Sequence, residues 1–427
     1  MTKGARKILF FVFFLIFLFF APLMILYYQG WRFDFDPPAG GKRITQTGGL
    51  FLKVIPKQAE IYLDGKLVKK TDFFFGSLLI ENLLPKRYLV EAKKNGYFSW
   101  KKDLEIKERE VTEAKNIVLF PENMDFEILA KNVEKLWFSP DGRKIILYED
   151  STPAGTGWAL KLYDLEKNLK SHLIEESDIT IKGANLMSLE WSQDSKEVAL
   201  EVRAQERSKY FALRIDKIPP ILTEKEPAPP LSEKLQAFKT FNGNLYLLDE
   251  FGQLFKNGER LTQKPFPVKS ETEYSLEIFP EDFIFLGENQ ILYQFNPDSQ
   301  SFEKFFEKIN GLKISPDNKK LLFFSDSEIW VLFLKEKLTR LIEKAGEKIL
   351  LARFSEKIES AFWLNSDYLI FNAGNKIKIA EIDERDKLNI VDLGEFESPE
   401  IFFNQTSDKK LYVLADGILY SSETFFK

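Results

Sequence analysis

The sequence LWFSPDGRKIILY (residues 136–148) contains the pattern that decides the fold. An apolar stretch with an aromatic residue leads into a Ser-Pro-Asp-Gly turn, and a second apolar stretch follows. Proline presets φ in such a turn, aspartate caps it through its side chain, and glycine adopts the conformation that other residues avoid. The pattern predicts a hairpin whose aromatic residue, just before the turn, packs against a neighbouring sheet.

The same pattern recurs through the C-terminal 300 residues. From the turn of one clear copy to the same position in the next, the distances are 53, 123, 49 and 41 residues for the five clearest copies. Because 123 is three times 41, two weaker copies are expected within the longest interval. The further copies are LEWSQDSKEVALEV (189–202), FNGNLYLL (241–248), FPEDFIFL (279–286), LKISPDNKKLLFF (312–324), AFWLNSDYLIF (361–371) and IFFNQTSDKKLYVL (401–414). A period of ~40–45 residues with several strands each is typical of β-propeller blades. Residues 123–427 are therefore predicted to form a seven-bladed β-propeller, with six or eight blades as the alternatives.

A propeller must join its first and last blades, because otherwise two sheet edges stay open. The last copy shows only three strands before the chain stops at Lys427. Upstream, Phe126–Leu129 lies in a strand-like segment (DFEILA, 125–130) that has no obvious role within the first blade. We therefore predict that this segment forms the outermost strand of the last blade, beside Gly417–Ser421.

Near the N-terminus, the run Ile8–Tyr28 (ILFFVFFLIFLFFAPLMILYY) has 21 residues and no charge. A helix of this length, at ~1.5 Å per residue, spans the ~30 Å hydrocarbon core of a bilayer. A buried globular helix would show a polar face, which this run lacks. We therefore expect residues 1–29 to form a cytoplasmic tip and a transmembrane helix that contacts the lipid bilayer through Ile8–Tyr28.

Positive charges lie before this run: Lys3, Arg6 and Lys7 precede it, whereas residues 31–41 carry a net charge of −1. This asymmetry predicts a single-pass protein in the cell membrane with a cytoplasmic N-terminus and an extracytoplasmic bulk. A cleaved signal peptide is the alternative. Its apolar stretch would be about 7–15 residues long and followed by small residues, whereas this run is longer and ends in Leu-Tyr-Tyr.

Between the helix and the propeller the sequence predicts a spacer (residues 30–48) and a small β-sandwich (residues 49–121). The spacer is rich in Gly and Pro, which exclude a helix. In the second segment, short apolar runs such as Leu50–Ile55 alternate with turns, and Asp64-Gly65 is a strong hairpin signal.

The stretches IPKQAEIYLDGK, NLLPKRYLVEAKKNGY and NIVLF resemble the PEGA domain family. The matching residues are Pro56, Ala59, Tyr62, Asp64, Gly65, Tyr88, Gly96 and Tyr97. The sequence departs from that pattern at Lys57-Gln58, where the family has Glu-Gly, and at Lys86-Arg87, where a glycine usually precedes the tyrosine. The resemblance implies an extracytoplasmic, usually non-catalytic sandwich of surface or envelope proteins. The repeated Ser-Pro-Asp-Gly turn likewise resembles TolB-like and WD-type propellers, in which it marks the hairpin after the first strand of a blade.

The composition excludes several kinds of site. The chain has no Cys and one His, His172, which rules out disulfides, thiolate zinc sites and multi-histidine metal sites. No signature of a nucleophile elbow, zinc protease or phosphate loop occurs. The turn residues Asp141, Asp194 and Asp317 lack the spacing of a calcium loop, so turn capping is their expected role. We predict no catalytic residue, no cofactor and no metal.

Charge is unevenly distributed along the chain. Residues 42–120 carry a net charge of +6 and residues 121–427 a net charge of −13. The overall charge of −5 argues against a nucleic-acid partner. One hypothesis is that Lys69, Lys70, Lys86 and Arg87 attract the sandwich to anionic lipid. The alternative is an ordinary solvated surface.

Together these patterns predict a non-catalytic protein that binds a cell-envelope protein or polymer through its propeller. An enzyme that cleaves envelope glycans or peptides with propeller carboxylates is one alternative, and a purely structural surface component is the other. The scaffold itself does not decide between them, since propellers host enzymes, receptors and docking surfaces alike.

Overall fold

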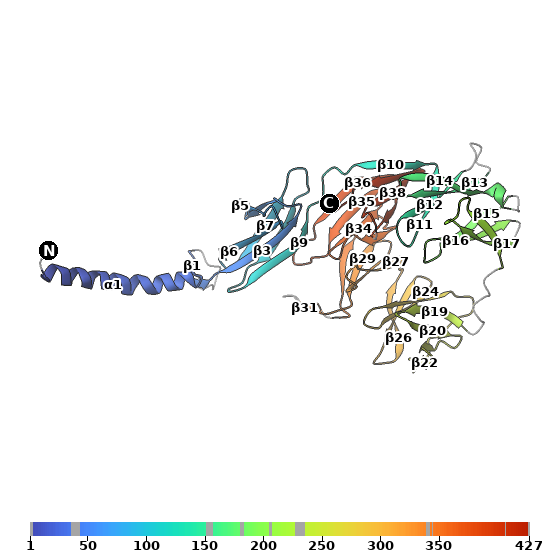
Figure 1. Cartoon of the computed structure of the whole chain (residues 1–427). Coiled ribbons are helices and arrows are strands. Elements are labelled where there is room, and N and C mark those ends of the chain that lie inside the picture. Colours follow the sequence, from blue (N-terminus) through green and yellow to red (C-terminus); the bar gives the residue numbers. More distant parts are fainter. Residues whose placement is uncertain are drawn as a thin grey trace. The chain divides into compact units, whose positions relative to one another are not determined.

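The computed structural model describes residues 3–425 except 36–42, 151–156, 180–182, 205–206, 227–234, 339–341, 344 and 406. Apart from one helix and a single 3-10 turn, the regular elements of the described residues are strands (Figure 1), so the prediction of an all-β protein with one N-terminal apolar helix is confirmed. The chain divides into two compact units. Unit 1 contains residues 1–123 and 381–391, and unit 2 contains residues 124–380 and 392–427.

Unit 1 begins with helix α1 (Lys3–Tyr28), which includes Pro22. A short hairpin follows, in which β1 (Trp31–Phe33) pairs with β2 (Ile44–Gln46). Residues 36–42 of the predicted spacer lie outside the described residues. The end of α1 is tied to the sheets of the unit, because the amide of Thr47 donates to the carbonyl of Gly30 at 2.9 Å.

Two sheets form the predicted sandwich of unit 1. One has the order β6-β3-β9 (Ser77–Leu83, Gly48–Ile55, Val111–Val118), and the other has the order β5-β4-β7-β8 (Lys66–Lys70, Glu60–Leu63, Arg87–Lys93, Trp100–Glu105). Both sheets contribute to one apolar core, in which Leu50, Ile61 and Val90 are fully buried. The strands alternate buried and exposed positions, as expected for sheets with one face on a core.

The Asp64-Gly65 hairpin is present where the sequence predicted it. Leu63 pairs with Lys66, and both turn residues have positive φ, at 49° and 76°. This is the backbone that two-residue hairpins require. The later strand β6 had no counterpart in the sequence prediction, because SLLIENL is too irregular to stand out.

Unit 2 contains seven four-stranded antiparallel sheets among its described residues, each called a blade and numbered along the chain. Blades 1 to 3 comprise β11–β14 (Val133–Phe138, Lys144–Asp150, Trp158–Asp164, Leu169–Glu175), β15–β18 (Asn185–Trp191, Glu197–Ala204, Arg207–Arg214, Ile221–Lys225) and β19–β22 (Leu235–Phe241, Asn244–Asp249, Leu254–Lys256, Glu259–Arg260). A 3-10 turn, η1 (Glu176–Asp178), follows β14.

Blades 4 to 6 comprise β23–β26 (Tyr274–Phe279, Phe283–Glu288, Ile291–Asn296, Ser301–Glu307), β27, β28, β29 and β32 (Gly311–Ile314, Lys320–Phe324, Glu328–Phe333, Lys348–Arg353) and β33–β36 (Ala361–Trp363, Tyr368–Ala373, Lys376–Glu381, Ile390–Glu395). A small hairpin, β30 (Lys337–Leu338) with β31 (Ile342–Glu343), is inserted in blade 5. Blade 7 has the order β10-β39-β38-β37 (Phe126–Lys131, Ile418–Ser422, Leu411–Ala415, Glu400–Phe403).

All seven sequence copies coincide with the hairpin between the first two strands of a blade. The predicted seven-bladed propeller is therefore confirmed, including the two weak copies at residues 241–248 and 279–286. Aromatic residues before the turns connect neighbouring blades as expected. The Trp191 indole donates to the carbonyl of Trp137 at 3.3 Å, and the Trp363 indole donates to that of Lys313 at 2.9 Å.

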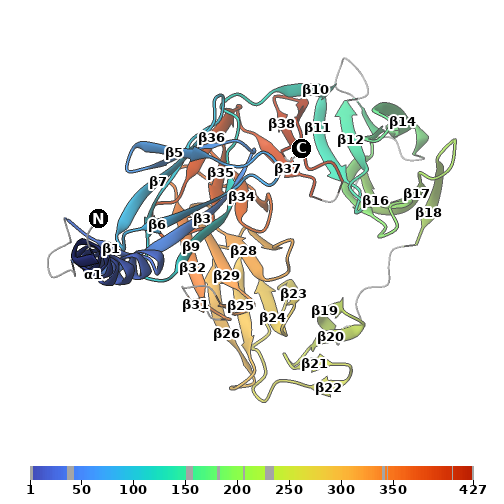
Figure 2. The same cartoon turned by 60° about the vertical axis from the view of Figure 1, so that its left-hand side comes forward.

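The predicted closure of the propeller is also confirmed. Strand β10 pairs antiparallel with β39, with Phe126 opposite Ser422 and Lys131 opposite Ile418. In both views β10 lies close to β38 of the same blade (Figures 1 and 2). Blade 7 and blade 1 share an apolar cluster in which Tyr412 and Leu419 contact Val133 and its neighbours. The chain segment before blade 1 thus completes the last blade and covers its edge.

Unit 1 includes the segment Glu381–Val391, which connects β35 to β36. No sequence pattern indicated that a segment from within the propeller repeats would belong to the sandwich. Its contacts with β8 are polar and are described below.

Candidate functional site

Helix α1 is long and apolar enough to cross a membrane, and none of its most apolar 18-residue stretch is buried by other parts of the chain. At its end, the Arg32 guanidinium lies 3.6 Å from the centre of the Tyr27 ring and donates to the Tyr27 carbonyl. An aromatic residue and a cation at a helix end suit the interface between lipid and water. A retained anchor and a signal sequence share these properties.

The four basic residues of the lipid hypothesis do not form one patch. Lys69 and Lys70 lie at the C-terminal end of β5, whereas Lys86 and Arg87 lie at the start of β7. Lys86 forms an ion pair with Asp64 in the turn before β5, at 3.1 Å. Because the turn and Lys70 lie at opposite ends of a five-residue strand, the two pairs are separated by roughly 13 Å. The sandwich therefore has a separate basic group at each end of β5.

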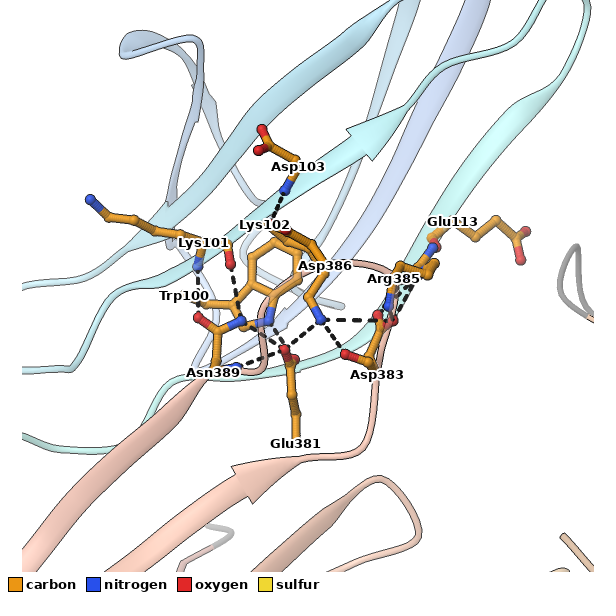
Figure 3. A network of polar contacts seen from close by, with 10 residues as sticks. All are labelled: Trp100, Lys101, Lys102, Asp103, Glu113, Glu381, Asp383, Arg385, Asp386 and Asn389. Carbon is orange, nitrogen blue, oxygen red and sulfur yellow. Dashed lines mark hydrogen bonds and ion pairs between the residues drawn. The ribbon is translucent and has the colours of Figure 1, made fainter. Parts of the chain in front are cut away.

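A buried charge cluster lies within unit 1, between β8 and the segment 381–391. Lys102 is 0% exposed, and its ammonium lies 2.6 Å from a Glu381 carboxylate oxygen and 3.7 Å from Asp383 (Figure 3). It also donates to the main-chain carbonyl of Asp383. The Trp100 indole donates to the second oxygen of Glu381 at 2.8 Å. A buried cation is thus paired and hydrogen-bonded, as burial requires.

Other members of this cluster hold the segment along β8. The Asn389 side chain accepts from the amide of Lys101 at 3.1 Å and donates to its carbonyl at 3.0 Å, like a strand partner. Arg385 binds Asp383 and also the carbonyl of Glu113 at 2.8 Å. Burial alone would raise the pKa of Asp383, but the Arg385 hydrogen bonds outweigh it and lower that pKa. Each polar group has a protein partner, so the cluster is a structural attachment rather than a reactive site.

The turn aspartates of the propeller cap their own turns, as the sequence indicated. Asp141 accepts from the Ser139 hydroxyl at 2.6 Å and from the amide of Arg143 at 3.1 Å. Asp194 and Asp317 make the same two kinds of bond with their own serine and following lysine. Among the described residues, no group of three or more His, Asp or Glu side chains could hold a metal ion.

A hollow of about 270 Å³ lies in unit 2 where the chain passes from blade 3 to blade 4. Its lining is aromatic, proline-rich and basic: Lys264, Pro265, Phe266, Pro267, Lys269, Glu288, Tyr293, Ser301 and Phe302. The Phe266 ring forms T-shaped pairs with Tyr293 and Phe302, with ring centres 4.8 and 5.9 Å apart. Sequence reasoning missed this site, although the unusual KPFPVK stretch at 264–269 marks it.

A single carboxylate organises the hollow. Glu288 is almost fully buried and accepts from the Lys269 ammonium at 2.7 Å, the Tyr293 hydroxyl at 3.1 Å and the Tyr274 hydroxyl at 3.3 Å. Burial alone would raise the pKa of Glu288, but the bonds from Lys269 and Tyr293 lower it below its ordinary value. The carboxylate is therefore ionised and neutralised within the site, which leaves Lys264 as the unneutralised charge of the lining.

Lys313 on β27 is the other unusual cation of the propeller. Its ammonium lies 3.1 Å from the centre of the Phe362 ring in the next blade, and burial lowers its pKa to about 8. An aromatic face stabilises a cation without neutralising it. The sequence showed no sign of this pairing, because the two residues are 49 positions apart.

The fold and these sites define a propeller protein with a membrane-type helix and a sandwich. No family model matches the chain, and no curated protein matches it either. Two solved structures resemble it over 70% of its length: YCF48 from Cyanidioschyzon merolae (10% identity, TM-score 0.40, 98% of that chain covered) and streptogramin B lyase (14% identity, TM-score 0.42, 98% covered). At these identities the likeness concerns the fold alone, and the propeller assignment rests on the seven sheets. The PEGA and TolB-like resemblances stay predictions.

Proposed function

We propose that this chain is a single-pass membrane protein with a cytoplasmic N-terminus and an extracytoplasmic bulk, and that its propeller binds a cell-envelope protein or polymer without catalysing a reaction. The apolar surface of α1 and the basic residues in its first two turns support the anchor and its direction. In the described residues, the turn carboxylates are occupied as caps, which favours binding over carboxylate catalysis.

The hollow between blade 4 and the segment 264–269 that leads into it is the observation that carries the binding role. Aromatic and proline side chains offer flat apolar surface, while Lys264 adds one positive charge that Glu288, already paired with Lys269, does not neutralise. Ligand sites commonly combine such a lining with a few fixed polar groups. A segment or polymer that carries both apolar groups and carboxylates would match it, although the propeller as a whole is acidic.

The binding role is tested with the full-length protein in detergent, immobilised and exposed to solubilised envelope fractions. We expect one envelope component to be retained, and we expect its retention to fall at least ~5-fold in Lys264→Glu and in Phe302→Ala, because each removes a main feature of the lining. Leu169→Ser, an exposed apolar residue of blade 1, is the matched control. Retention of nothing by the wild type would refute the function, and equal retention by all variants would exclude the hollow.

The direction of the chain is tested separately by adding protease to intact cells. An extracytoplasmic propeller is digested without lysis, whereas a propeller on the cytoplasmic side is protected until the cells are opened. Retained α1 in the mature protein, detected by its mass, distinguishes the anchor from a cleaved signal sequence.

A further inference from the structure

Three consecutive phenylalanines project from the loop between β5 and β6, which is here called the aromatic tip (residues 72–76). Phe73, Phe74 and Phe75 are 65, 73 and 73% exposed. An isolated exposed apolar side chain is ordinary, but adjacent large ones form a surface that usually has a partner. Burying a phenylalanine removes a large apolar surface from water and stabilises a fold, and the three rings of the tip do not contribute this stabilisation.

The conformation of the aromatic tip is nevertheless fixed by specific interactions. The Asp72 carboxylate accepts from the amides of Phe74, Phe75 and Ser77 and from the Ser77 hydroxyl, at 2.6–2.8 Å. Gly76 has a φ of 68°, and a side chain there would meet the Val54 carbonyl at 2.4 Å. Hydrogen bonds and a required glycine thus hold the three rings in solvent.

Lysines surround the aromatic tip. Lys69 and Lys70 precede it on β5, Lys53 pairs with Ser77 just after it, and the Lys57 side chain lies beside Gly76. Of these, Lys70 also forms an ion pair with Glu60 on β4, at 3.1 Å. The one carboxylate inside the tip, Asp72, accepts four hydrogen bonds from the loop itself. The tip therefore combines exposed rings with a basic surround, which is the composition of surfaces that enter the headgroup region of anionic bilayers.

The register of β3 and β6 places the tip away from α1. Gly48, beside the end of α1, pairs with Leu83, whereas Lys53 pairs with Ser77 next to the tip. The Arg32 guanidinium, just after α1, also binds Asn82 at the far end of β6. The tip and α1 are thus at opposite ends of the same strand pair, about 17 Å apart along it.

We propose that the aromatic tip inserts into the surface of an anionic lipid bilayer other than the one that α1 spans, so that the protein links two membranes. The geometry favours lipid over a protein groove. The Phe73 and Phe74 rings pack edge to face, with their centres 5.5 Å apart, so the tip presents one apolar surface with ammonium groups around it. A lipid interface accommodates both together, because the rings can enter the acyl boundary while the ammonium groups stay beside the anionic headgroups. This inference rests on the proposed anchor.

The test uses full-length protein reconstituted through α1 into dense, sucrose-loaded phosphatidylcholine vesicles. Fluorescent acceptor vesicles containing about 30% phosphatidylglycerol are added, and their co-sedimentation is measured per protease-accessible protein. We expect the wild type to capture acceptors. The triple variant Phe73→Ser, Phe74→Ser, Phe75→Ser should reduce capture at least ~10-fold, whereas Phe251→Ser, an equally exposed propeller phenylalanine, should leave it unchanged.

Further variants and acceptor vesicles separate the contribution of the lysine charges from that of the phenylalanine rings. Lys69→Glu with Lys70→Glu should lower capture and flatten its dependence on salt, and acceptors of pure phosphatidylcholine should be captured less. Equal melting temperatures of all variants establish that folding is intact. Failure of the protein to stay in donor vesicles would contradict the anchor, whereas stable donors that capture no acceptors would overturn the tip proposal. A photo-crosslinker at Phe74 that labels a protein instead of lipid in cells would overturn it as well.

Discussion

The sandwich and the propeller assemble their sheets in different ways. In the propeller, most strands pair with the strand before or after them in the sequence, and blades 1 to 4 and blade 6 keep strict chain order. In the sandwich, β3 pairs in parallel with β9, so Gly49 lies opposite Val111. The segment Glu381–Val391 comes from still further away. Pairing between strands that are neighbours in the sequence therefore dominates the propeller, whereas the sandwich depends more on pairing between distant segments.

Buried charges show the same contrast. In the propeller, the buried carboxylate Glu149 takes Lys161 from the next strand of its own blade, at 2.7 Å. In the sandwich, the fully buried Lys102 takes Glu381, 279 positions along the chain. Closing a long loop costs more conformational entropy than closing a short one. The sandwich thus depends on distant residues, whereas each blade is largely complete in itself.

The exception within the propeller provides the strongest test of this comparison. Strand β10 is the one long-range strand of unit 2 among its described residues, and it covers the edge of blade 7. Deleting residues 123–130 should destabilise unit 2 by about 5 kcal/mol or more, because an open edge and the cluster around Tyr412 are exposed. Chemical denaturation and binding of a dye to apolar surface measure the effect.

Ile128→Ser is the matched control for this deletion, because Ile128 is half exposed and the strand remains. Its stability should stay within about 0.5 kcal/mol of the wild type. A deletion variant that unfolds as cooperatively as the wild type, without dye binding, would show that the local pairings suffice and that closure contributes little.

The buried cluster of the sandwich is the next largest test. Lys102→Met leaves Glu381 buried without its cation, which should cost about 3–5 kcal/mol. The loss should appear in the unfolding of unit 1, followed by the fluorescence of Trp100, whose indole bonds to the same carboxylate.

A second substitution sharpens that test. Lys102→Met with Glu381→Leu removes both charges, so it should recover a large part of the lost stability if the penalty comes from the unpaired carboxylate. A double variant no better than Lys102→Met would show that the hydrogen bonds from Asn389 and Trp100, rather than the charge pairing, hold the segment.

The contrast between the two units also explains which parts of the fold could be predicted from the sequence. The propeller was predictable because each hairpin carries its own local signal, and a fixed period then revealed even copies as weak as residues 241–248. Strand β10 was predictable because a ring needs closure and the last copy lacked a strand. Such arguments use only neighbouring residues and a counting rule.

The hidden parts are those that depend on distant partners or on exposure. Nothing in KKD at 101–103 indicates that its second lysine is fully buried, because Glu381 supplies the reason. The run FFF at 73–75 has the composition of a buried segment. In the structure it lies in the loop before β6, and all three rings are exposed. The hollow needs Pro265 and Phe302 brought together, which no spacing predicts.

A smaller test concerns the equivalence of the blades. The hydroxyls of Ser139 and Ser315 accept from the amides of Lys144 and Lys320 at 3.0 and 2.9 Å in the same turn position. Replacing either serine by alanine should cost about 1 kcal/mol, with equal losses in both blades. Unequal losses, measured by denaturant midpoints, would mean that the blades are not energetically interchangeable despite their shared turn.

The smallest effect on stability is expected at Glu288. Its local ion pair with Lys269 can be distinguished from the other interactions of the propeller by its dependence on pH. The pKa of Glu288 is lowered from 4.5 in the folded state by Lys269 and the tyrosine hydroxyls. A lowered carboxyl pKa contributes stability that is fully present above pH 4.5 and is lost as the pH falls through the folded-state value. Because Lys269 is largely exposed, the contribution should be below about 1 kcal/mol.

Glu288→Gln removes this titration. The variant should therefore be less stable than the wild type at pH 7, and the difference should shrink as the pH falls below 4.5, since the wild-type carboxylate then takes up a proton and loses its ion pair. Glu259→Gln, at an exposed position of blade 3, is the control and should show a small difference that does not vary with pH. Melting temperatures between pH 7 and about pH 3 measure both. If the gap between Glu288→Gln and the wild type persists unchanged to the lowest pH, the carboxylate acts by filling space and accepting neutral hydrogen bonds. The buried charges of the propeller would then differ from Lys102 in kind and not only in the distance of their partners.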